Sequence, residues 1–387
     1  MAVQIKVLTD KTGLRPPVNE GAFDCLRLLA ALGVLFSHCY PLVGQGQAEP
    51  CARLTGGFTL GTLAVYAFFA MSGYLVSQSW ARDPSLPRFL IRRCLRILPG
   101  LFFVITASFL VLGPIATTHS LHEYFARPDA YSYLAKIFIY PGQYGLPGVF
   151  DDNPLPHVVN GSLWTLRLEF ALYVIIGVLG WLGFMRWRMA GIGLMIFFLA
   201  GYGAVSYGLG SDGIGNDGIP SYAPLNYAGF FGSITHAAGL TEALSQLSAH
   251  RQILDFFANA CSFAVGVALA QNRIESGRGK LLALALILGS AATFYTRDFI
   301  PAILLLSFPC LVLLAAHHLQ CHRGRMGDCS YGLYLWGFPV EQLIIHWFAP
   351  LSVAELFMLA VPLTLAMAIL SWHLIEMPAL RFKPRRE

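Results

Sequence analysis

Apolar runs long enough to cross a lipid bilayer recur along nearly the whole chain, separated by short polar breaks. A membrane-spanning helix needs about 20 mostly apolar residues. The pattern therefore predicts an all-α, polytopic membrane helix bundle with about ten transmembrane helices. The expected segments are 22–44, 58–80, 98–115, 161–183, 189–210, 253–271, 281–296, 299–317, 330–350 and 354–375. For the pair 281–296 and 299–317, a helical hairpin with a buried turn is the alternative.

Composition supports the membrane interpretation. Of the 387 residues, 56% are hydrophobic and only 12% are charged, whereas an average soluble domain carries roughly 25% charged residues. The mean hydropathy is +0.59. A soluble protein of this size would need about twice this charge to cover its surface. The excess apolar surface is therefore expected to face lipid.

The chain is expected to form one membrane domain, 22–375, between two short tails. Residues 1–21 are polar and basic, and the apolar run that follows them is long enough to span a bilayer. A signal peptide would instead place a short apolar run before a small-residue cleavage site. We therefore expect 1–21 to remain as a cytoplasmic tail. Pro378 is expected to end the last helix at Glu376, which leaves a basic cytoplasmic tail, 376–387.

The distribution of basic residues predicts the orientation of the bundle. With the N-terminus inside and alternating crossings, 19 of the 26 Lys and Arg residues fall in inside segments and 5 in outside segments. The positive-inside rule describes such a bias. An odd number of helices would place the basic C-terminal tail outside and weaken the bias. Both termini are therefore expected to be cytoplasmic.

Arg27 and His38 lie in the first expected helix, 11 residues apart. At about 100° per residue this is three turns plus roughly 20°, so the two side chains share a face. Charged groups inside a bilayer usually face a cavity or a partner. An ion pair with Asp24 is the alternative for Arg27, and an interhelical hydrogen bond is the alternative for His38. A histidine above an arginine in one cavity suits proton exchange beside an anionic donor that enters from the cytoplasm.

Glu169 is expected at a depth similar to that of His38. It lies ~12 Å below the outer end of its helix, against ~9 Å for His38, at 1.5 Å of rise per residue. The two side chains can meet if their helices pack together, and the carboxylate would then orient the imidazole. Arg167 lies two residues earlier and is expected to point elsewhere. A purely structural pairing of Glu169 with an arginine is the alternative.

Four arginines precede the third expected helix, on the expected cytoplasmic side. Arg88, Arg92 and Arg96 are spaced i, i+4 and i+8, which gives one basic helix face, with Arg93 on an adjoining face. A planar guanidinium can donate two hydrogen bonds to a phosphate. A phosphate-bearing carrier such as coenzyme A fits this surface. A positive anchor against anionic lipid is the alternative.

The remaining features add less chemistry. The outside segments 116–160 and 211–252 are rich in Gly, Pro and Tyr, and they can hold a sugar acceptor or merely connect helices. The sequence shows no metal-ligand cluster and no nucleophilic serine elbow. We expect no permanently bound cofactor and no nucleic-acid partner. The Ser72-Gly73 pair is expected to serve close helix packing.

Taken in order, these residues resemble acyltransferase family 3 over almost the whole chain. The family pattern begins with an Arg, ten residues and a His in the first helix, here Arg27 and His38. The other matching motifs are Phe68-Phe-Ala-Met-Ser-Gly-Tyr74, Arg93-Cys-Leu-Arg96-Ile-Leu-Pro99, Ser162 to Glu169, Ser330-Tyr-Gly-Leu-Tyr-Leu-Trp-Gly-Phe-Pro339 and Trp372-x-x-x-Glu376-x-Pro378. Many members carry a His before the Pro of the ninth helix, where this chain has Gly337-Phe338, so any role of that His does not transfer.

The resemblance implies an integral membrane O-acyltransferase in a bacterial cell inner membrane. Its donor would be acyl-CoA, usually acetyl-CoA, and its acceptor a hydroxyl of a surface polysaccharide, lipopolysaccharide or related glycolipid. His38 would act as general base, with Glu169 orienting it or contacting the acceptor, and the pantetheine arm would pass Arg27. The expected acyl-CoA-binding residues are Arg93, Arg96, Arg92 and Arg88.

Two other functions stay open at this point. Intramembrane His, Glu and Arg residues also make proton relays, so a proton-coupled transporter that uses the His38/Glu169 pair is one alternative. Transporters tend to show paired interrupted helices in related halves, and the sequence shows none. The other alternative is a non-catalytic scaffold that binds glycolipid. Consumption of acyl-CoA by the purified protein separates the enzyme from both.

Overall fold

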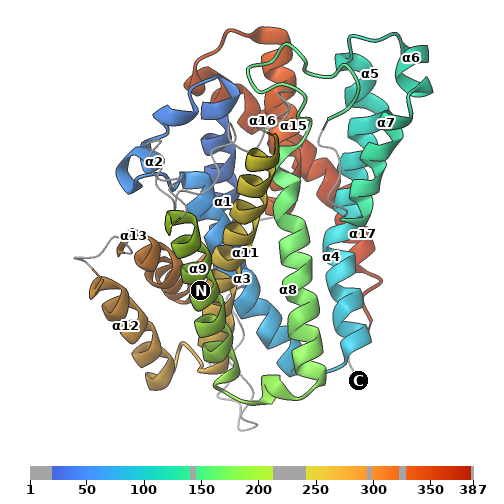
Figure 1. Cartoon of the computed structure of the whole chain (residues 1–387). Coiled ribbons are helices and arrows are strands. Elements are labelled where there is room, and N and C mark those ends of the chain that lie inside the picture. Colours follow the sequence, from blue (N-terminus) through green and yellow to red (C-terminus); the bar gives the residue numbers. More distant parts are fainter. Residues whose placement is uncertain (1–19, 140–144, 212–240, 294–298, 322–327, 385–387) are drawn as a thin grey trace, which may run out of the picture.

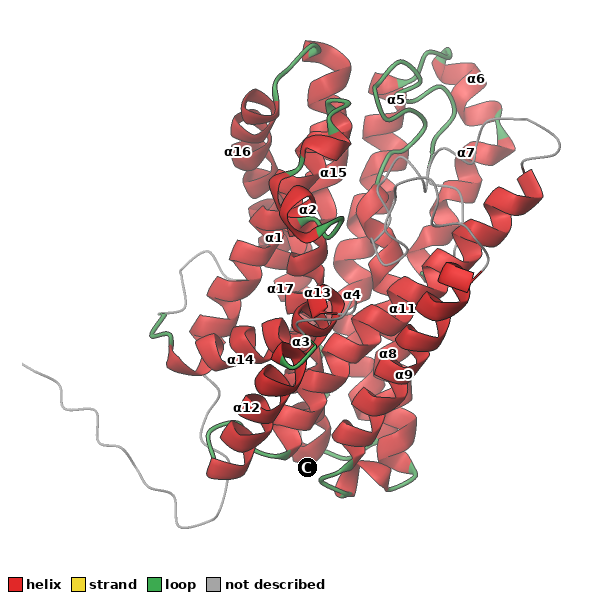
Figure 2. Cartoon of the chain, turned by 60° about the vertical axis from the view of Figure 1, so that its left-hand side comes forward, coloured by secondary structure: helices red, strands yellow, loops and turns green. Residues whose placement is uncertain are grey.

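The computed structural model describes residues 20–139, 145–211, 241–293, 299–321 and 328–384. These residues form a bundle of helices joined by loops and turns (Figures 1 and 2). Nearly all of the predicted tail 1–21, and most of the predicted outside segment 211–252, lie outside the described residues.

Ten longer helices make up the bundle within the described residues. They are α1 (Glu20–Leu42), α3 (Leu60–Arg82), α4 (Leu86–Ala107), α8 (Trp164–Trp181), α9 (Ala190–Ser211), α11 (Thr241–Gln271), α12 (Gly277–Ala291), α14 (Phe308–His318), α15 (Ser330–Phe348) and α16 (Val353–Ser371). The shorter ones are α2 (Pro50–Thr55), α5 (Gly113–Ala116), α6 (Leu121–Ala126), α7 (Pro128–Ser132), α13 (Phe299–Ala302) and α17 (Met377–Leu380). A short 3₁₀ segment, η4 (Gly161–Leu163), directly precedes α8.

Seven helical stretches in the described part of the chain are long and apolar enough to cross a membrane. They are Gly21–Leu42, Leu60–Arg82, Leu86–Ala116, Gly161–Trp181, Arg251–Gln271, Ile300–His318 and Val353–Leu380. The other predicted segments, 189–210, 281–296 and 330–350, also contain helices, namely α9, α12 and α15. The chain is thus a multi-pass helical bundle, while the number of about ten crossings and the placement of the termini stay predictions.

The third spanning helix begins earlier than the sequence predicted. The prediction was 98–115, but α4 starts at Leu86, so the basic segment forms its first three turns. Pro87 lies at the start of the helix, where a missing N–H costs nothing. Arginines are tolerated in these turns because two of them pair with Asp83, the residue that caps the preceding helix.

Three wide π-turns interrupt the helices, and each lies directly before a proline. The turns Ser108–Leu112, Ile303–Ser307 and Trp372–Glu376 are each followed, after one residue, by Pro114, Pro309 or Pro378. A proline inside an α-helix loses an N–H bond and clashes with the carbonyl four residues earlier, and an i→i+5 turn accommodates it. The prediction that Pro378 ends the last helix at Glu376 was therefore wrong, since the helical run continues to Leu380.

Helices α3 and α11 cross so closely at the centre of the bundle that only glycine fits at two positions. A Cβ atom at Gly73 would lie 2.0 Å from the carbonyl oxygen of Phe263, and one at Gly266 would lie 2.1 Å from that of Ala70. Small residues allow such close approach of membrane helices. The prediction that Ser72-Gly73 serves close helix packing is thus confirmed for Gly73.

Replacing Gly73 by leucine is expected to destabilise the bundle by about 3 kcal/mol or more, because overpacking forces backbone shifts. The measurement is the midpoint of thermal unfolding of the purified protein in detergent. Gly193 on α9 is the matched control, since a Cβ atom there meets nothing within 4 Å. Equal midpoints for the Gly73→Leu and Gly193→Leu variants would contradict the close crossing.

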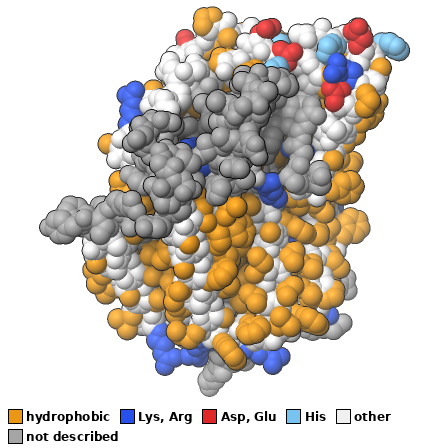
Figure 3. Space-filling model, viewed as in Figure 1, with side chains coloured by type: hydrophobic (Ala, Val, Ile, Leu, Met, Phe, Trp, Pro, Cys, Tyr) orange, Lys and Arg blue, Asp and Glu red, His pale blue; other side chains and the backbone are white. Residues whose placement is uncertain are grey.

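Large apolar side chains cover the outside of the bundle at mid-height. In Figure 3 a broad hydrophobic band separates a lower edge, where Lys and Arg gather, from an upper edge that carries the Asp and Glu visible in this view. The exposed apolar residues include Phe102, Leu110, Val111, Leu284, Met358 and Leu363. Such a belt is what a protein surrounded by lipid exposes.

Candidate active site

Two adjoining pockets lie inside the bundle, and they follow one another along the helices. The histidine pocket is lined by residues that include Ser37, His38, Thr62, Trp164, Arg167 and Asp255. The arginine pocket is lined by residues that include Arg27, Ser72, Arg93, Arg96, Glu169 and Tyr173. On α1 and α3 the two sets occupy different stretches of the helix, while on α8 residues of the two sets alternate. Val65 and Tyr334 line both pockets, so the two spaces meet at these side chains.

His38 forms one wall of the histidine pocket and is 3% exposed. Its Nδ1 lies 3.6 Å from Oε2 of Glu341, a fully buried carboxylate on α15. The other oxygen of Glu341 accepts a hydrogen bond from the Cys39 thiol at 3.4 Å. The imidazole also packs edge-on against Phe338, with 5.3 Å between the ring centroids. A carboxylate and an aromatic ring therefore fix the position of this histidine.

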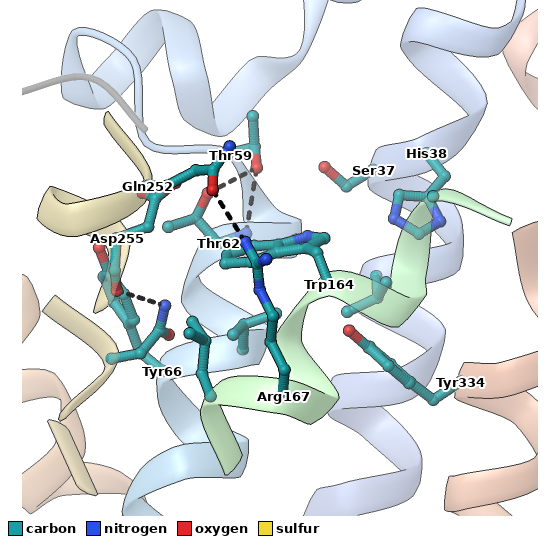
Figure 4. Close-up of a pocket in the computed structure, with 16 residues that line it drawn as sticks. Ser37, His38, Thr59, Thr62, Tyr66, Trp164, Arg167, Gln252, Asp255 and Tyr334 are labelled. Atoms are coloured by element: carbon teal, nitrogen blue, oxygen red, sulfur yellow. Dashed lines mark hydrogen bonds between the residues drawn. The ribbon is translucent and has the colours of Figure 1, made fainter. Parts of the chain in front are cut away.

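The opposite wall of the histidine pocket is polar and comes from α8 and α11 (Figure 4). The Arg167 guanidinium donates a hydrogen bond to Oε1 of Gln252 at 3.0 Å. Asp255 and Asn259 lie one and two turns further along α11. The flat ring of Trp164 lies between Arg167 and the side of the pocket that holds Ser37 and His38. The pocket thus combines an aromatic face with hydrogen-bonding groups of both kinds, opposite the histidine.

Glu169 lies in the arginine pocket, where it is part of a hydrogen-bonded group of three side chains. The hydroxyls of Ser72 and Tyr173 both donate to Oε1 of Glu169. Those two hydroxyl oxygens are also 2.9 Å apart. The guanidinium of Arg93 lies over the Tyr173 ring, 5.6 Å from its centroid. In the described part of the chain, Arg93 forms no ion pair within 4 Å, so its charge is available to a ligand in the pocket.

Asp328, which precedes α15, binds two of the pocket's arginines. Its Oδ2 lies 2.5 Å from Arg96 and 3.6 Å from Arg27. Arg27 also lies 3.7 Å from Asp24, and the Ser330 hydroxyl donates to the other oxygen of Asp328. Burial alone would raise the pKa of Asp328, but the charges of Arg96 and Arg27 outweigh it and hold the pKa well below its usual value.

Arg88 and Arg92 belong to a different ion cluster, outside both pockets. Arg88 donates to one oxygen of Asp83 at 3.0 Å and Arg92 to the other at 2.6 Å. The hydrogen bond from Arg92 is the main reason that the pKa of Asp83 lies below its usual value despite burial. The basic face predicted at i, i+4 and i+8 is therefore divided, because Arg96 turns to Asp328 while the first two arginines turn to Asp83.

Comparison with protein families identifies the chain. The sequence profile described as "Acyltransferase domain" matches residues 20–376, nearly the whole chain. The chain belongs to acyltransferase family 3. It is therefore an enzyme that transfers acyl groups, as the motif pattern predicted. This acyltransferase is 28% identical to the "O-acetyl transferase" of Shigella phage Sf6 over 362 residues, which cover 92% of this chain and 95% of that protein.

A second relative gives the same picture. This acyltransferase is 29% identical to "Nodulation protein 10" of Rhizobium leguminosarum bv. viciae over an alignment of 395 positions, which covers 94% of each chain. No solved structure matches the sequence significantly. The family match favours the enzyme over the transporter and scaffold alternatives.

The geometry of the acyltransferase separates residues that the sequence grouped together. The sequence allowed His38 and Glu169 to meet if their helices pack together, but in the structure they line different pockets, and the carboxylate beside His38 is Glu341. The physical reason is that α8 brings Glu169 opposite α3, where Ser72 of α3 and Tyr173 of α8 donate hydrogen bonds to it. Arg27 lines the same pocket as Glu169.

Two residues of this acyltransferase site had weak signals in the sequence. Glu341 is an acidic residue in the middle of an apolar segment, which is itself a sign of a functional or paired group, but nothing local names His38 as its neighbour. Asp328 lies outside the expected segments, two residues before the motif that begins at Ser330. Arg167, expected to point elsewhere than Glu169, does so and enters the histidine pocket.

Proposed function

We propose that this acyltransferase moves an acyl group, in the simplest case acetyl, from acyl-CoA to a hydroxyl of a glycan acceptor. The observation that carries the proposal is the pair of adjoining pockets, one with a buried histidine and the other with three arginines. This arrangement suits a reaction in which an anionic donor and a neutral hydroxyl approach one another from opposite sides. The printed name of the phage relative, an O-acetyl transferase, supports the choice of an oxygen acceptor.

The arginine pocket suits the donor. Arg93 carries a charge that no described carboxylate neutralises within 4 Å, and Arg96 is held in place by Asp328. Phosphate is the ligand for which a fixed guanidinium is best shaped. We assign the phosphates of acyl-CoA to Arg93 and Arg96, with Arg27 in the same pocket. Arg88 and Arg92 stabilise the start of α4 through Asp83 and leave the donor set.

The histidine pocket suits the chemical step. In this proposal His38 takes the proton of the acceptor hydroxyl, and the hydroxyl oxygen attacks the acyl carbon. The carbon–sulfur bond then breaks, and the CoA thiolate takes up the proton from His38. Glu341, 3.6 Å from the imidazole, positions it, as a carboxylate does for a catalytic histidine. Holding both reactants in adjoining pockets supplies part of the acceleration, since well-oriented reactions gain ~7–11 kcal/mol.

The polar wall of the histidine pocket suits a sugar. A carbohydrate offers hydroxyls that donate and accept, together with an apolar ring face. Arg167, Gln252 and Asp255 supply matching donors and acceptors, and Trp164 supplies an aromatic surface. We propose a cell-surface polysaccharide, lipopolysaccharide or related glycolipid as the acceptor class.

The charge distribution supports an orientation. The start of α4 and the end of α8 lie at the same end of the bundle in Figure 1, and Lys and Arg gather at that end in Figure 3. The positive-inside rule assigns such an end to the cytoplasm. The arginine pocket would then face cytoplasmic acyl-CoA, and the histidine pocket would face outward. A bacterial inner membrane, with both termini cytoplasmic, is the proposed location.

Release of CoA thiol tests the proposal. Membrane vesicles that contain the protein would be mixed with acetyl-CoA that carries a labelled acetyl group and with a bacterial glycolipid extract. We expect thiol release together with alkali-labile label on the glycan fraction, which marks an ester. Vesicles without the protein are the control. If neither signal exceeds that control with a broad set of extracts, the proposed reaction is wrong.

Arginines from the two ion clusters should differ in their effect on donor binding. Replacing Arg93 by glutamine is expected to raise KM for acetyl-CoA by about tenfold to a hundredfold, because hydrogen bonds to charged groups contribute ~1.5–3 kcal/mol. Arg88→Gln is the matched control on the same helix and should leave KM within about twofold, because Arg88 lies outside the lining of both pockets. Steady-state kinetics with acetyl-CoA as the varied substrate measures both. Equal shifts in the two variants would contradict the assignment of the donor to the arginine pocket.

A further inference from the structure

Tyr334 occupies the junction between the two pockets. Besides Val65, it is the residue that lines both of them. At the start of α8, two consecutive residues line different pockets: Trp164 lines the histidine pocket and Thr165 lines the arginine pocket. The boundary between the pockets is therefore formed by Val65 on α3, Tyr334 on α15 and the first turn of α8. Figure 4 shows the Tyr334 ring below Trp164 and His38.

The Tyr334 side chain is held in this place from two sides. Its hydroxyl donates to the carbonyl oxygen of Ser162 at 2.8 Å and lies 2.6 Å from the hydroxyl oxygen of Thr165. The phenol has one proton, so the Thr165 hydroxyl donates to it. On the other side, the ring packs edge-on against Phe68, with 5.8 Å between centroids. The side chain thus bridges from α15 to η4 and α8, across the space between the pockets.

The position of Tyr334 matters because this side chain lies between the pocket assigned to the acyl donor and the pocket that holds His38. The three arginines lie on one side of the junction and His38 lies on the other. An acyl thioester held by Arg93 and Arg96 must extend past Tyr334 to reach the histidine. Water is a competing acceptor wherever the thioester and His38 meet, since the same base activates a water molecule as readily as a sugar hydroxyl.

We propose that Tyr334 is the residue that makes the enzyme prefer a bound hydroxyl over water, by closing the passage between the pockets until the thioester is drawn through. The inference rests on the proposed function. Hydrolysis is the reaction that the closed passage suppresses. In it the water oxygen bonds to the acyl carbon, the carbon–sulfur bond breaks, and the proton lost to His38 passes to the CoA thiolate.

Hydrolysis without acceptor tests the proposal directly. Purified protein in detergent would receive acetyl-CoA alone, and free CoA thiol would be followed for wild type, Tyr334→Phe and Tyr334→Ala. Tyr334→Phe keeps the ring and loses the hydroxyl contacts, so hydrolysis should rise about tenfold, the effect of roughly one net hydrogen bond. Tyr334→Ala should exceed Tyr334→Phe. Adding His38→Ala to either variant should abolish the gain.

Two controls make the outcome specific. Tyr124→Phe removes a buried phenol hydroxyl that donates to the carbonyl oxygen of Phe109 at 2.9 Å, away from both pockets, and it should hydrolyse acetyl-CoA at the wild-type rate. In vesicles, a cysteine introduced as Ser72→Cys in the arginine pocket should react with an impermeant maleimide from the histidine-pocket side only when Tyr334→Ala is also present. Mass spectrometry of residue 72 reads the modification.

The proposal is overturned if both Tyr334 variants hydrolyse acetyl-CoA no faster than wild type while wild type transfers to glycan. It is equally overturned if residue 72 reacts from that side with Tyr334 intact. A wild type that fails to transfer to glycan refutes the proposed function instead. The maleimide experiment still decides whether Tyr334 closes the passage in that case, since it needs no turnover.

Discussion

The variant His38→Ala is expected to lower acyl transfer by about 10²–10⁴-fold, the usual contribution of a positioned general base. The loss should be this large because His38 is the proposed base and lines the histidine pocket, and alanine supplies no substitute. The measurement is CoA thiol release from acetyl-CoA with a glycolipid extract, at matched protein levels. KM for acetyl-CoA should change little, since the donor is assigned to the other pocket.

His346→Ala is the matched control. This histidine lies in the last turn of α15, outside the lining of both pockets, with its ring against Phe150. Its replacement should leave transfer within about twofold, as for a substitution away from special features. If His38→Ala turns over as fast as His346→Ala, the enzyme class survives but another group acts as the base.

The variant Asp328→Asn is expected to lower the free energy of unfolding by about 3–5 kcal/mol, because removing one partner of a buried ion pair leaves the other uncompensated. Asp328 is 6% exposed and lies within 4 Å of two arginines, so Arg96 loses its partner and Arg27 keeps only Asp24. Asparagine keeps the shape and can keep the contact with Ser330. Thermal unfolding of the purified protein in detergent measures the loss.

Asp129→Asn is the matched control, since it removes an aspartate from an exposed pair. The Asp129 and Arg127 side chains are 35% and 48% exposed, and such surface pairs contribute only about 0–1 kcal/mol. Similar losses in the two variants would mean that Asp328 is not the buried partner that the structure shows.

The effect of Asp328 should also depend on pH in a defined direction. The pKa of Asp328 is lower in the folded protein than in the unfolded chain, where it is about 4. The contribution of Asp328 to the free energy of unfolding is therefore fully present above about pH 4 and is lost as pH falls through the folded pKa. The difference in the free energy of unfolding between wild type and Asp328→Asn should therefore stay constant from about pH 8 to pH 5 and shrink below about pH 4.

Much of the fold followed from patterns that are local in the sequence. Apolar runs of about 20 residues are sufficient to place spanning helices, so α1, α3, α8 and α16 lie where the sequence predicted them. The start of α4 was misplaced because charge alone suggested a surface segment. Whether an arginine lies inside or outside a helix depends on its partner, and Asp83 precedes the helix by only a few residues.

The site was less predictable, because its contacts join distant segments. Local patterns were sufficient to select His38, Glu169 and the arginines, but they could not show which helix faces α1 at the depth of His38. Glu341 lies 303 residues after His38, and its proximity results from α15 packing beside α1. The depth estimated from helix rise made Glu169 as good a partner for His38 as Glu341. Only the arrangement of the helices decides between these two carboxylates.

The three wide turns before Pro114, Pro309 and Pro378 have a consequence for comparing relatives. A turn closed by an i→i+5 bond holds one residue more than an α turn, and that residue rotates everything beyond it by about 100° relative to an uninterrupted helix. A homologue that lacks the proline can therefore drop one residue at the same place and still present the same faces to its neighbours. Single-residue gaps beside these prolines would then record a change of helix winding, with the side chains beyond them still in equivalent positions.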